Sequence, residues 1–243
     1  MDSLLARELK LRYQPIAVIP SNQQPENTFK FKENGWSCVI GMLMEAARGA
    51  TVALDRKIVR CPGGKTGVGF GNSYAGHLDV VSQFLSTGRP GKFEGEAYKK
   101  TPELARSMIE DVPARDMPFK YMVFKPLGSV NAEKEQPWLI IFLVNPDQLS
   151  ALIVLANYSR SHNHNVIINM SSACSSICLY PLNECENGQL RAVVGLTDIT
   201  VRHYLDPDLL SFTVPWSMFR QMEADAPGSF LDKKPWNKLR ERI

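Results

Sequence analysis

The stretch from Gly35 to Gly71, GWSCVIGMLMEAARGATVALDRKIVRCPGGKTGVGFG, constrains the fold of this chain more than any other. Apolar residues recur at the i, i+3, i+4, i+7 spacing from Trp36 to Ala47, which predicts an amphipathic helix with Asn34 as N-cap and Gly49 as C-cap. The next segment, ATVALD, predicts a strand. CPGGKTGVGFG then predicts a glycine-rich loop, which brings backbone N–H groups close to whatever it faces. We expect a binding site at this loop.

The remaining segments alternate between strand and helix patterns without a regular βαβ repeat. Strands are predicted at 14–20, 121–124, 138–144, 165–169, 190–196 and 211–214, and helices at 76–86, from 101, from 145, at 171–178 and from 215. The chain has 243 residues, 44% of them hydrophobic, which is enough for a sizeable core. We therefore expect an α/β or α+β fold: a single compact domain spanning residues 1–243, with a mixed β-sheet flanked by helices.

Charge and hydropathy argue against two classes of partner. The net charge of +3 is too small for a nucleic-acid-binding surface. No apolar run reaches the ~18 residues that a membrane span requires. The N-terminal sequence MDSLLARELKLR is charged and does not resemble a signal peptide. We expect a cytoplasmic protein with no nucleic-acid or membrane partner, whose five cysteines do not form a full disulfide set.

Four cysteines are candidate metal ligands. Cys174 and Cys178 are four residues apart and would share one face of a helix, Cys38 lies near a helix start, and Cys61 opens the glycine loop. Backbone dipoles at such places favour the thiolate, which is the form that binds iron. Cys38, Cys61 and Cys174 would then hold a [4Fe–4S] cluster, with Cys178 or a small ligand on the fourth iron. The spacing matches no compact ferredoxin or zinc motif, so simple burial of the cysteines is the alternative.

The glycine loop offers a second kind of site. GGKTG resembles part of a P-loop, but Val59 occupies the position where that motif needs its first glycine, so we reject a nucleotide site. Lys65 and the backbone amides of Gly63, Gly64 and Gly67 would suit an anion instead. A tight turn packed near the core explains the same residues without any ligand.

WSCVIGMLMEAARG followed by VRCPGGKTGVGFG resembles the uncharacterised prokaryotic family called ArCR, a domain of unknown function. Three further segments agree with it: FLVNPDQLSALI, SSACSSICLYP and TVPWSMF. The resemblance covers about residues 14–225 and leaves 1–12 and 233–243 peripheral. It implies that Cys38, Cys61 and Cys174 belong together, and it supplies no reaction.

Two hypotheses of different classes result. In the first, the chain is an iron–sulfur protein whose [4Fe–4S] cluster, easily lost in air, has a redox or small-ligand role and serves a redox partner. In the second, the chain is metal-free and binds a small molecule or anion with the Gly63–Gly71 segment and Lys65. A homodimer is the base-rate expectation for its assembly. The sequence leaves open whether the protein is an enzyme.

Overall fold

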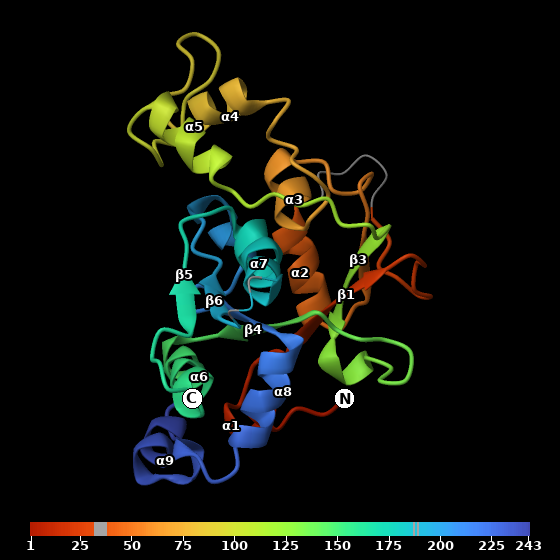
Figure 1. The fold of residues 1–243 in the computed structure, drawn as a ribbon, viewed down its shortest axis with the longest axis vertical. Helices are drawn as coiled ribbons and strands as arrows, with labels where there is room; N and C mark the ends of the chain where they lie inside the picture. Colours follow the sequence, from red (N-terminus) through yellow and green to blue (C-terminus); the bar gives the residue numbers. More distant parts are fainter. Residues whose placement is uncertain (32–37, 187, 189) are drawn as a thin grey trace.

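A computed structural model describes residues 1–31, 38–186, 188 and 190–243. In this part of the chain the strands form one sheet in the order β2-β3-β1-β4-β7-β6-β5 (Figure 1). Neighbouring strands are antiparallel, except β5 and β6, which are parallel. The predicted mixed sheet is therefore confirmed. The strands are β1 (Ile16–Ser21), β2 (Val52–Leu54), β3 (Tyr121–Pro126), β4 (Leu139–Val144), β5 (Val166–Ile168), β6 (Ala192–Gly195) and β7 (Leu210–Pro215).

Helices connect and flank these strands. None of those described is long and apolar enough to cross a membrane. The α-helices are α1 (Leu4–Glu8), α2 (Val39–Ala47), α3 (Pro62–Gly67), α4 (Leu78–Phe84), α5 (Pro102–Glu110), α6 (Pro146–Tyr158), α7 (Tyr180–Glu186), α8 (Trp216–Asp225) and α9 (Lys234–Arg240). Short helices of other types are η1 (Leu127–Ser129), η2 (Ser175–Leu179, a π-helical turn that leads into α7), η3 (Ile199–Tyr204) and η4 (Phe230–Asp232).

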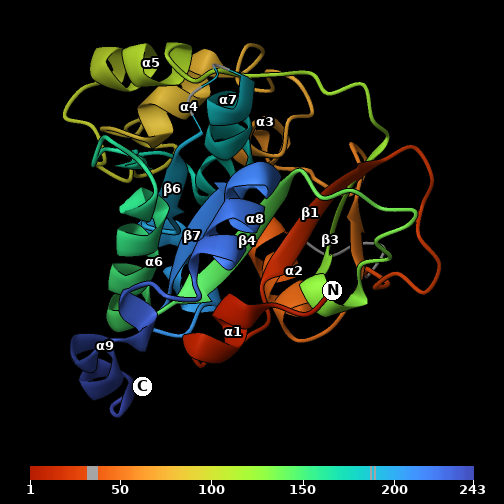
Figure 2. The same ribbon diagram turned by 60° about the horizontal axis from the view of Figure 1, so that its bottom comes forward.

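The sheet is covered on both faces. Along β1, Ile16 and Val18 join the core cluster on the α2 side, while Ala17 and Ile19 join the cluster that includes residues of α6 and α8. Figure 2 shows α8 in front of the sheet, α6 to the left of β6 and β7, and α2 behind the sheet. Because both faces are covered, a central strand can be apolar throughout, as all six buried residues of β4 are. The terminal segments, expected to be peripheral, contribute the buried side chains of Leu5, Leu9 and Trp236 to the α6–α8 side.

Two predictions for the Gly35–Gly71 stretch need correction. Helix α2 begins at Val39 with Cys38 as its N-cap, and the N-cap predicted at Asn34 lies outside the described residues. The expected glycine loop is in large part the helix α3, which starts on a proline at its first position, where proline is favoured. In the CPGGKTGVGFG segment, backbone conformations that favour glycine occur only after this helix, at Gly69 and Gly71, with positive φ angles of 83° and 91°.

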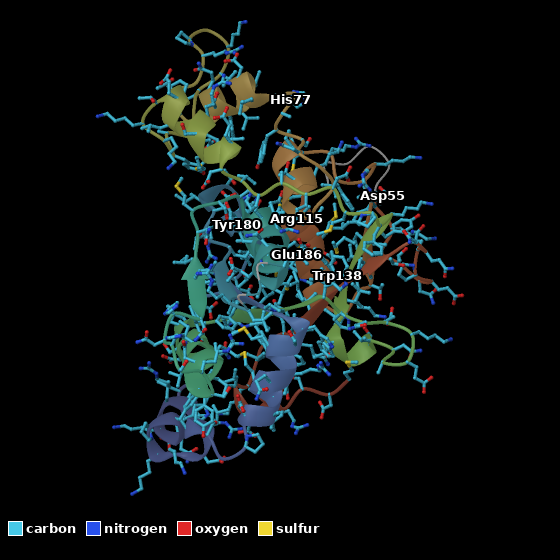
Figure 3. All side chains as sticks on the ribbon, in the orientation of Figure 1. Asp55, His77, Arg115, Trp138, Tyr180 and Glu186 are labelled. Atoms are coloured by element: carbon cyan, nitrogen blue, oxygen red, sulfur yellow. The ribbon has the colours of Figure 1, made fainter. Side chains whose placement is uncertain are left out.

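Helices α4 and α5 pack on each other and extend beyond the sheet (Figure 1). We call the part of the chain from Leu78, where α4 begins, to Glu110, where α5 ends, the α4–α5 lobe. The chain segments that enter and leave the lobe are hydrogen-bonded to each other. Gly71 N donates to Arg115 O at 2.8 Å, and Met117 N donates to Gly69 O at 2.8 Å. Arg115 also forms an ion pair with Glu186 of α7 (Figure 3). These contacts fix the base of the lobe against the body of the molecule.

The start of α6 gives a test of the fold. The Asn145 side chain accepts a hydrogen bond from Gln148 N at 3.0 Å, and the Gln148 side chain accepts one from Asn145 N at 3.0 Å, which makes a capping box. We expect Asn145→Ala to lower the free energy of unfolding by about 1 kcal/mol, measured by urea denaturation. Asn145→Asp keeps the acceptor and should lose much less. Equal losses in the two variants would contradict this account of the helix start.

Candidate functional site

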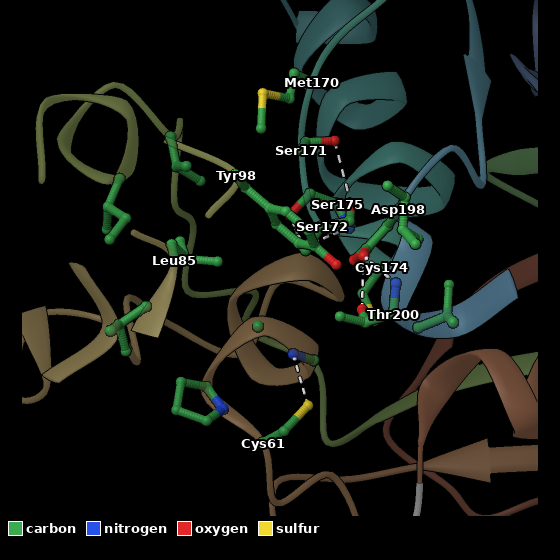
Figure 4. Close-up of a pocket in the computed structure, with 18 of the residues that line it drawn as sticks. Cys61, Leu85, Tyr98, Met170, Ser171, Ser172, Cys174, Ser175, Asp198 and Thr200 are labelled. Carbon is green, nitrogen blue, oxygen red and sulfur yellow. Dashed lines mark hydrogen bonds between the residues drawn. The ribbon is translucent and has the colours of Figure 1, made fainter. Parts of the chain in front are cut away.

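A cavity of about 870 Å³ lies between the α4–α5 lobe and the body of the molecule. Figure 4 shows most of its lining side chains converging on one space. Segments from many parts of the chain build it. The described lining residues are Cys38, Cys61, Pro62, Gly63, Gly64, Tyr74, Val81, Phe84, Leu85, Tyr98, Met108, Ile109, Val112, Met170, Ser171, Ser172, Cys174, Ser175, Tyr180, Thr197, Asp198, Ile199, Thr200, Val201, His203 and Tyr204.

The lobe supplies an apolar wall. Val81, Phe84 and Leu85 come from α4 and its end, and Met108 and Ile109 come from α5. The segment that carries Tyr98 is held to the end of α4 by backbone hydrogen bonds. Ala97 N donates to Ser86 O at 3.0 Å, and Lys99 N donates to Leu85 O at 3.0 Å. Tyr98 is therefore positioned by the lobe, and it faces the body across the cavity (Figure 4).

On the body side, α3 packs against the start of the helical segment that contains η2. A Cβ atom added to Gly67 would lie 2.5 Å from Cys174 Cβ and 2.7 Å from Ser175 N, so only glycine fits at this contact. Gly64 is similarly close to its neighbours, because an added Cβ would lie 2.7 Å from Cys61 Sγ. The glycines of this stretch thus allow α3 to approach the helix that begins near Cys174, and Gly63 and Gly64 expose main chain to the cavity.

Polar groups gather at the body end of the cavity. The Asp198 carboxylate caps η3: its Oδ1 accepts hydrogen bonds from Thr200 N at 3.1 Å and Thr200 Oγ1 at 2.6 Å. Its Oδ2 accepts one from Ala173 N at 3.2 Å. The Ser172 and Ser175 hydroxyls lie 2.9 Å apart, which is hydrogen-bond distance. Tyr74 is buried beside them, and this burial raises the pKa of Tyr74 to about 12 against the opposite effect of a hydrogen bond with Ser172.

The structure places Cys38, Cys61 and Cys174 on the wall of this one cavity, whereas Cys178 lies in the core with no exposed surface. Cys61 Sγ accepts a hydrogen bond from Gly64 N at 3.0 Å and so caps α3. Burial raises the pKa of all three of Cys61, Cys174 and Cys178, most strongly for the latter two. Lys65 and Gly67 are not among the lining residues.

The [4Fe–4S] prediction is therefore wrong. Within the described part of the chain, no three histidine, cysteine, aspartate or glutamate side chains are grouped so that they could hold a metal ion. The prediction relied on backbone dipoles to favour thiolates, but loss of solvation outweighs them and keeps Cys174 and Cys178 as thiols. The Gly64 amide lowers the pKa of Cys61, and burial still determines the direction of the shift.

Sequence reasoning missed Asp198, Tyr74 and Tyr98 as site residues. The pattern from Asp198 to Thr200 is a capping signal shortly after the end of β6, and it gave a reason to place a fixed carboxylate beyond the end of that strand. Tyr98 carries no such signal, because it reaches the cavity only through the packing of the lobe.

Comparison with known families places most of the chain in one of them. A family model described as Uncharacterised ArCR matches residues 4–225. No curated protein and no solved structure matches the chain significantly.

The contact of α3 with Cys174 can be tested by substitution. We expect Gly67→Ala to lower the free energy of unfolding by about 2 kcal/mol, because its Cβ overlaps Cys174. Gly76→Ala is the matched control, since an added Cβ there meets nothing within 4 Å. Thermal or urea unfolding of both variants measures the difference. A Gly67→Ala variant as stable as Gly76→Ala would contradict the close packing.

Cys178 gives a pH-dependent prediction. Its thiol has a pKa well above the ordinary 9.0 because it is buried. The thiol pKa is higher in the folded chain than in the unfolded chain, so this group contributes its full stabilisation below about pH 9. Above that pH the unfolded chain releases its proton first, and the stabilisation is lost progressively. Relative to Cys178→Ala, the wild type should lose up to about 1.4 kcal/mol per pH unit above that point. Urea unfolding between about pH 7 and pH 10 measures this. A constant difference across the range would contradict it.

Proposed function

The chain belongs to the family described as Uncharacterised ArCR, and we propose that it binds a small, largely apolar organic molecule in the cavity between the α4–α5 lobe and the sheet. The observation that carries this proposal is the form of the cavity. Its volume of about 870 Å³ falls in the range of small-molecule sites, which span roughly 300–1,000 Å³. Such sites combine apolar walls with a few convergent polar groups.

The distribution of side chains supports this ligand class. Aliphatic, aromatic and methionine side chains line the cavity from the lobe, among them Val81, Phe84 and Met108. Hydroxyl groups and the Asp198 carboxylate lie together at the body end. A ligand with an apolar body and one polar end would satisfy both regions, because the apolar part leaves water and the polar part keeps hydrogen-bond partners.

The glycine segment takes a different role from the anion site expected at Gly63–Gly71 and Lys65. Helix α3 has six residues, and Lys65 does not line the cavity. Gly63 and Gly64 instead form a stretch of wall without side chains, which gives a ligand room beside Cys61. We infer that this segment shapes the pocket.

A cytoplasmic location is also part of the proposal. It is supported by the cysteines, since all five are free thiols in the structure. Free thiols persist in a reducing compartment.

Filling the cavity tests the proposal. We expect Val81→Trp to weaken binding of a neutral apolar dye such as Nile red at least tenfold, because the indole occupies ligand space at the α4 wall. Val154→Trp is the control: Val154 is 50% exposed on α6 and does not line the cavity. Fluorescence titration and thermal unfolding measure both variants. Binding that is not saturable in the wild type, or is equal in the two variants, would overturn the proposal.

A further inference from the structure

We propose that the polar end of the ligand is an amine cation held by Asp198, with Tyr74 and Tyr98 beside it. The inference rests on the proposed function, because it concerns the chemistry of the molecule bound in that cavity. It names a substrate class: a primary or secondary amine with an apolar body. The argument comes from the charges at the polar end, the acceptors left free there and the aromatic side chains around it.

Two residues of the wall have an acidic or a basic side chain. Among the described lining residues, Asp198 is the only carboxylate and His203 the only basic side chain. His203 is exposed and lies against the Tyr204 ring, with 4.0 Å between the ring centroids. Asp198 forms no ion pair with any described residue. The polar end therefore presents a carboxylate that a cationic ligand group would complement.

The carboxylate is held rigidly and keeps a free acceptor site. Three of about four lone-pair positions on a carboxylate are occupied here, two by Thr200 and one by Ala173 N. The remaining position, on Oδ2, can accept from an ammonium group without breaking any of these bonds. A carboxylate fixed before the ligand arrives loses little side-chain entropy on binding.

Three backbone donors near this end are used inside the protein. Ala173 N donates to Asp198, and Ser175 N and Ser176 N donate to Ser172 O at 3.0 and 3.2 Å. These three N–H groups at the start of the helix are therefore already hydrogen-bonded within the protein and are not free to bind an anion. An anionic ligand would also face the Asp198 charge at short range, which disfavours it.

Aromatic side chains complete the environment of a cation. Tyr74 and Tyr204 line the cavity from the body, and Tyr98 approaches from the lobe (Figure 4). Burial raises the pKa of Tyr98, and the carboxylates of Glu96 and Asp198 add to the effect. Aromatic faces around a carboxylate are a general arrangement for binding ammonium groups. The apolar body of the amine would then lie along Val81 and Leu85.

A matched series of probes tests the inference: 4-phenylbutylamine, 4-phenylbutanol and 5-phenylpentanoate, which share the 4-phenylbutyl group as one apolar body. We expect wild-type protein to bind the amine at least tenfold more tightly than the alcohol, and to bind the acid most weakly, measured by calorimetry or Nile red displacement. In Asp198→Asn the amine and alcohol should bind within about threefold of each other, since the amide keeps an acceptor for Thr200 but loses the charge. Asp208→Asn, at a carboxylate that does not line the cavity, is the control that should keep the preference.

The outcomes separate this inference from the proposed function. If the alcohol or the acid binds wild-type protein as tightly as the amine, the amine assignment is overturned, while the pocket still binds apolar molecules. If Asp198→Asn keeps the tenfold preference, Asp198 is not the group that recognises the ligand, and the inference also fails. If no probe binds and the Val81→Trp variant behaves as the wild type, the proposed function itself fails. The comparison of the three probes on wild-type protein uses no variant. It can therefore refute the inference even if the Asp198→Asn protein folds poorly.

Discussion

The close contact between Gly67 of α3 and Cys174 is the constraint on which the cavity depends. It brings the segment after Cys61 against the helix that starts at residue 173. Even the Cβ atom of an alanine at position 67 would overlap Cys174. On one side of this contact, Gly63 and Gly64 form the floor of the cavity, and on the other side Ser172 and Ser175 form its polar end. The site therefore exists because two segments far apart in the sequence meet at a residue without a side chain.

The same contact determines the chemistry of the cysteines. A short helix start lowers a thiol pKa by an amount equivalent to about 0.3–1 kcal/mol, whereas full burial shifts a pKa by up to several units. Packing of α3 leaves Cys174 only 6% exposed, so desolvation dominates and the group stays protonated. The position of each cysteine in the sequence indicated the weaker effect, that of the helix dipole. It gave no measure of the stronger effect, which is desolvation by burial. This is why the sequence around Cys38, Cys61 and Cys174 suggested thiolate ligands for a metal. In the structure these three cysteines are part of the cavity wall.

Much of the fold could be predicted because it depends on local signals. The apolar run of β4 and the N-caps Thr101 and Asn145 mark their elements within a few residues. Helix α3 could not be predicted, since its glycines have poor helix propensity and the helix forms through contacts with Cys174. The candidate site was predictable only in part. Cys61 and Gly63 were singled out by sequence, whereas Tyr98 enters the site through tertiary packing.

The α4–α5 lobe shows how a site can be positioned by contacts outside it. Its entering and leaving segments pair at Gly69 and Met117, and Arg115 adds an ion pair to α7. These bonds lie at the base of the lobe, while its apolar side chains and Tyr98 project over the cavity. Because the base is fixed by backbone hydrogen bonds, the distance between the apolar wall and Asp198 is set before any ligand binds. Under the proposed function, a cavity preformed in this way would select its ligand by the length of the apolar body as well as by the charge at the polar end.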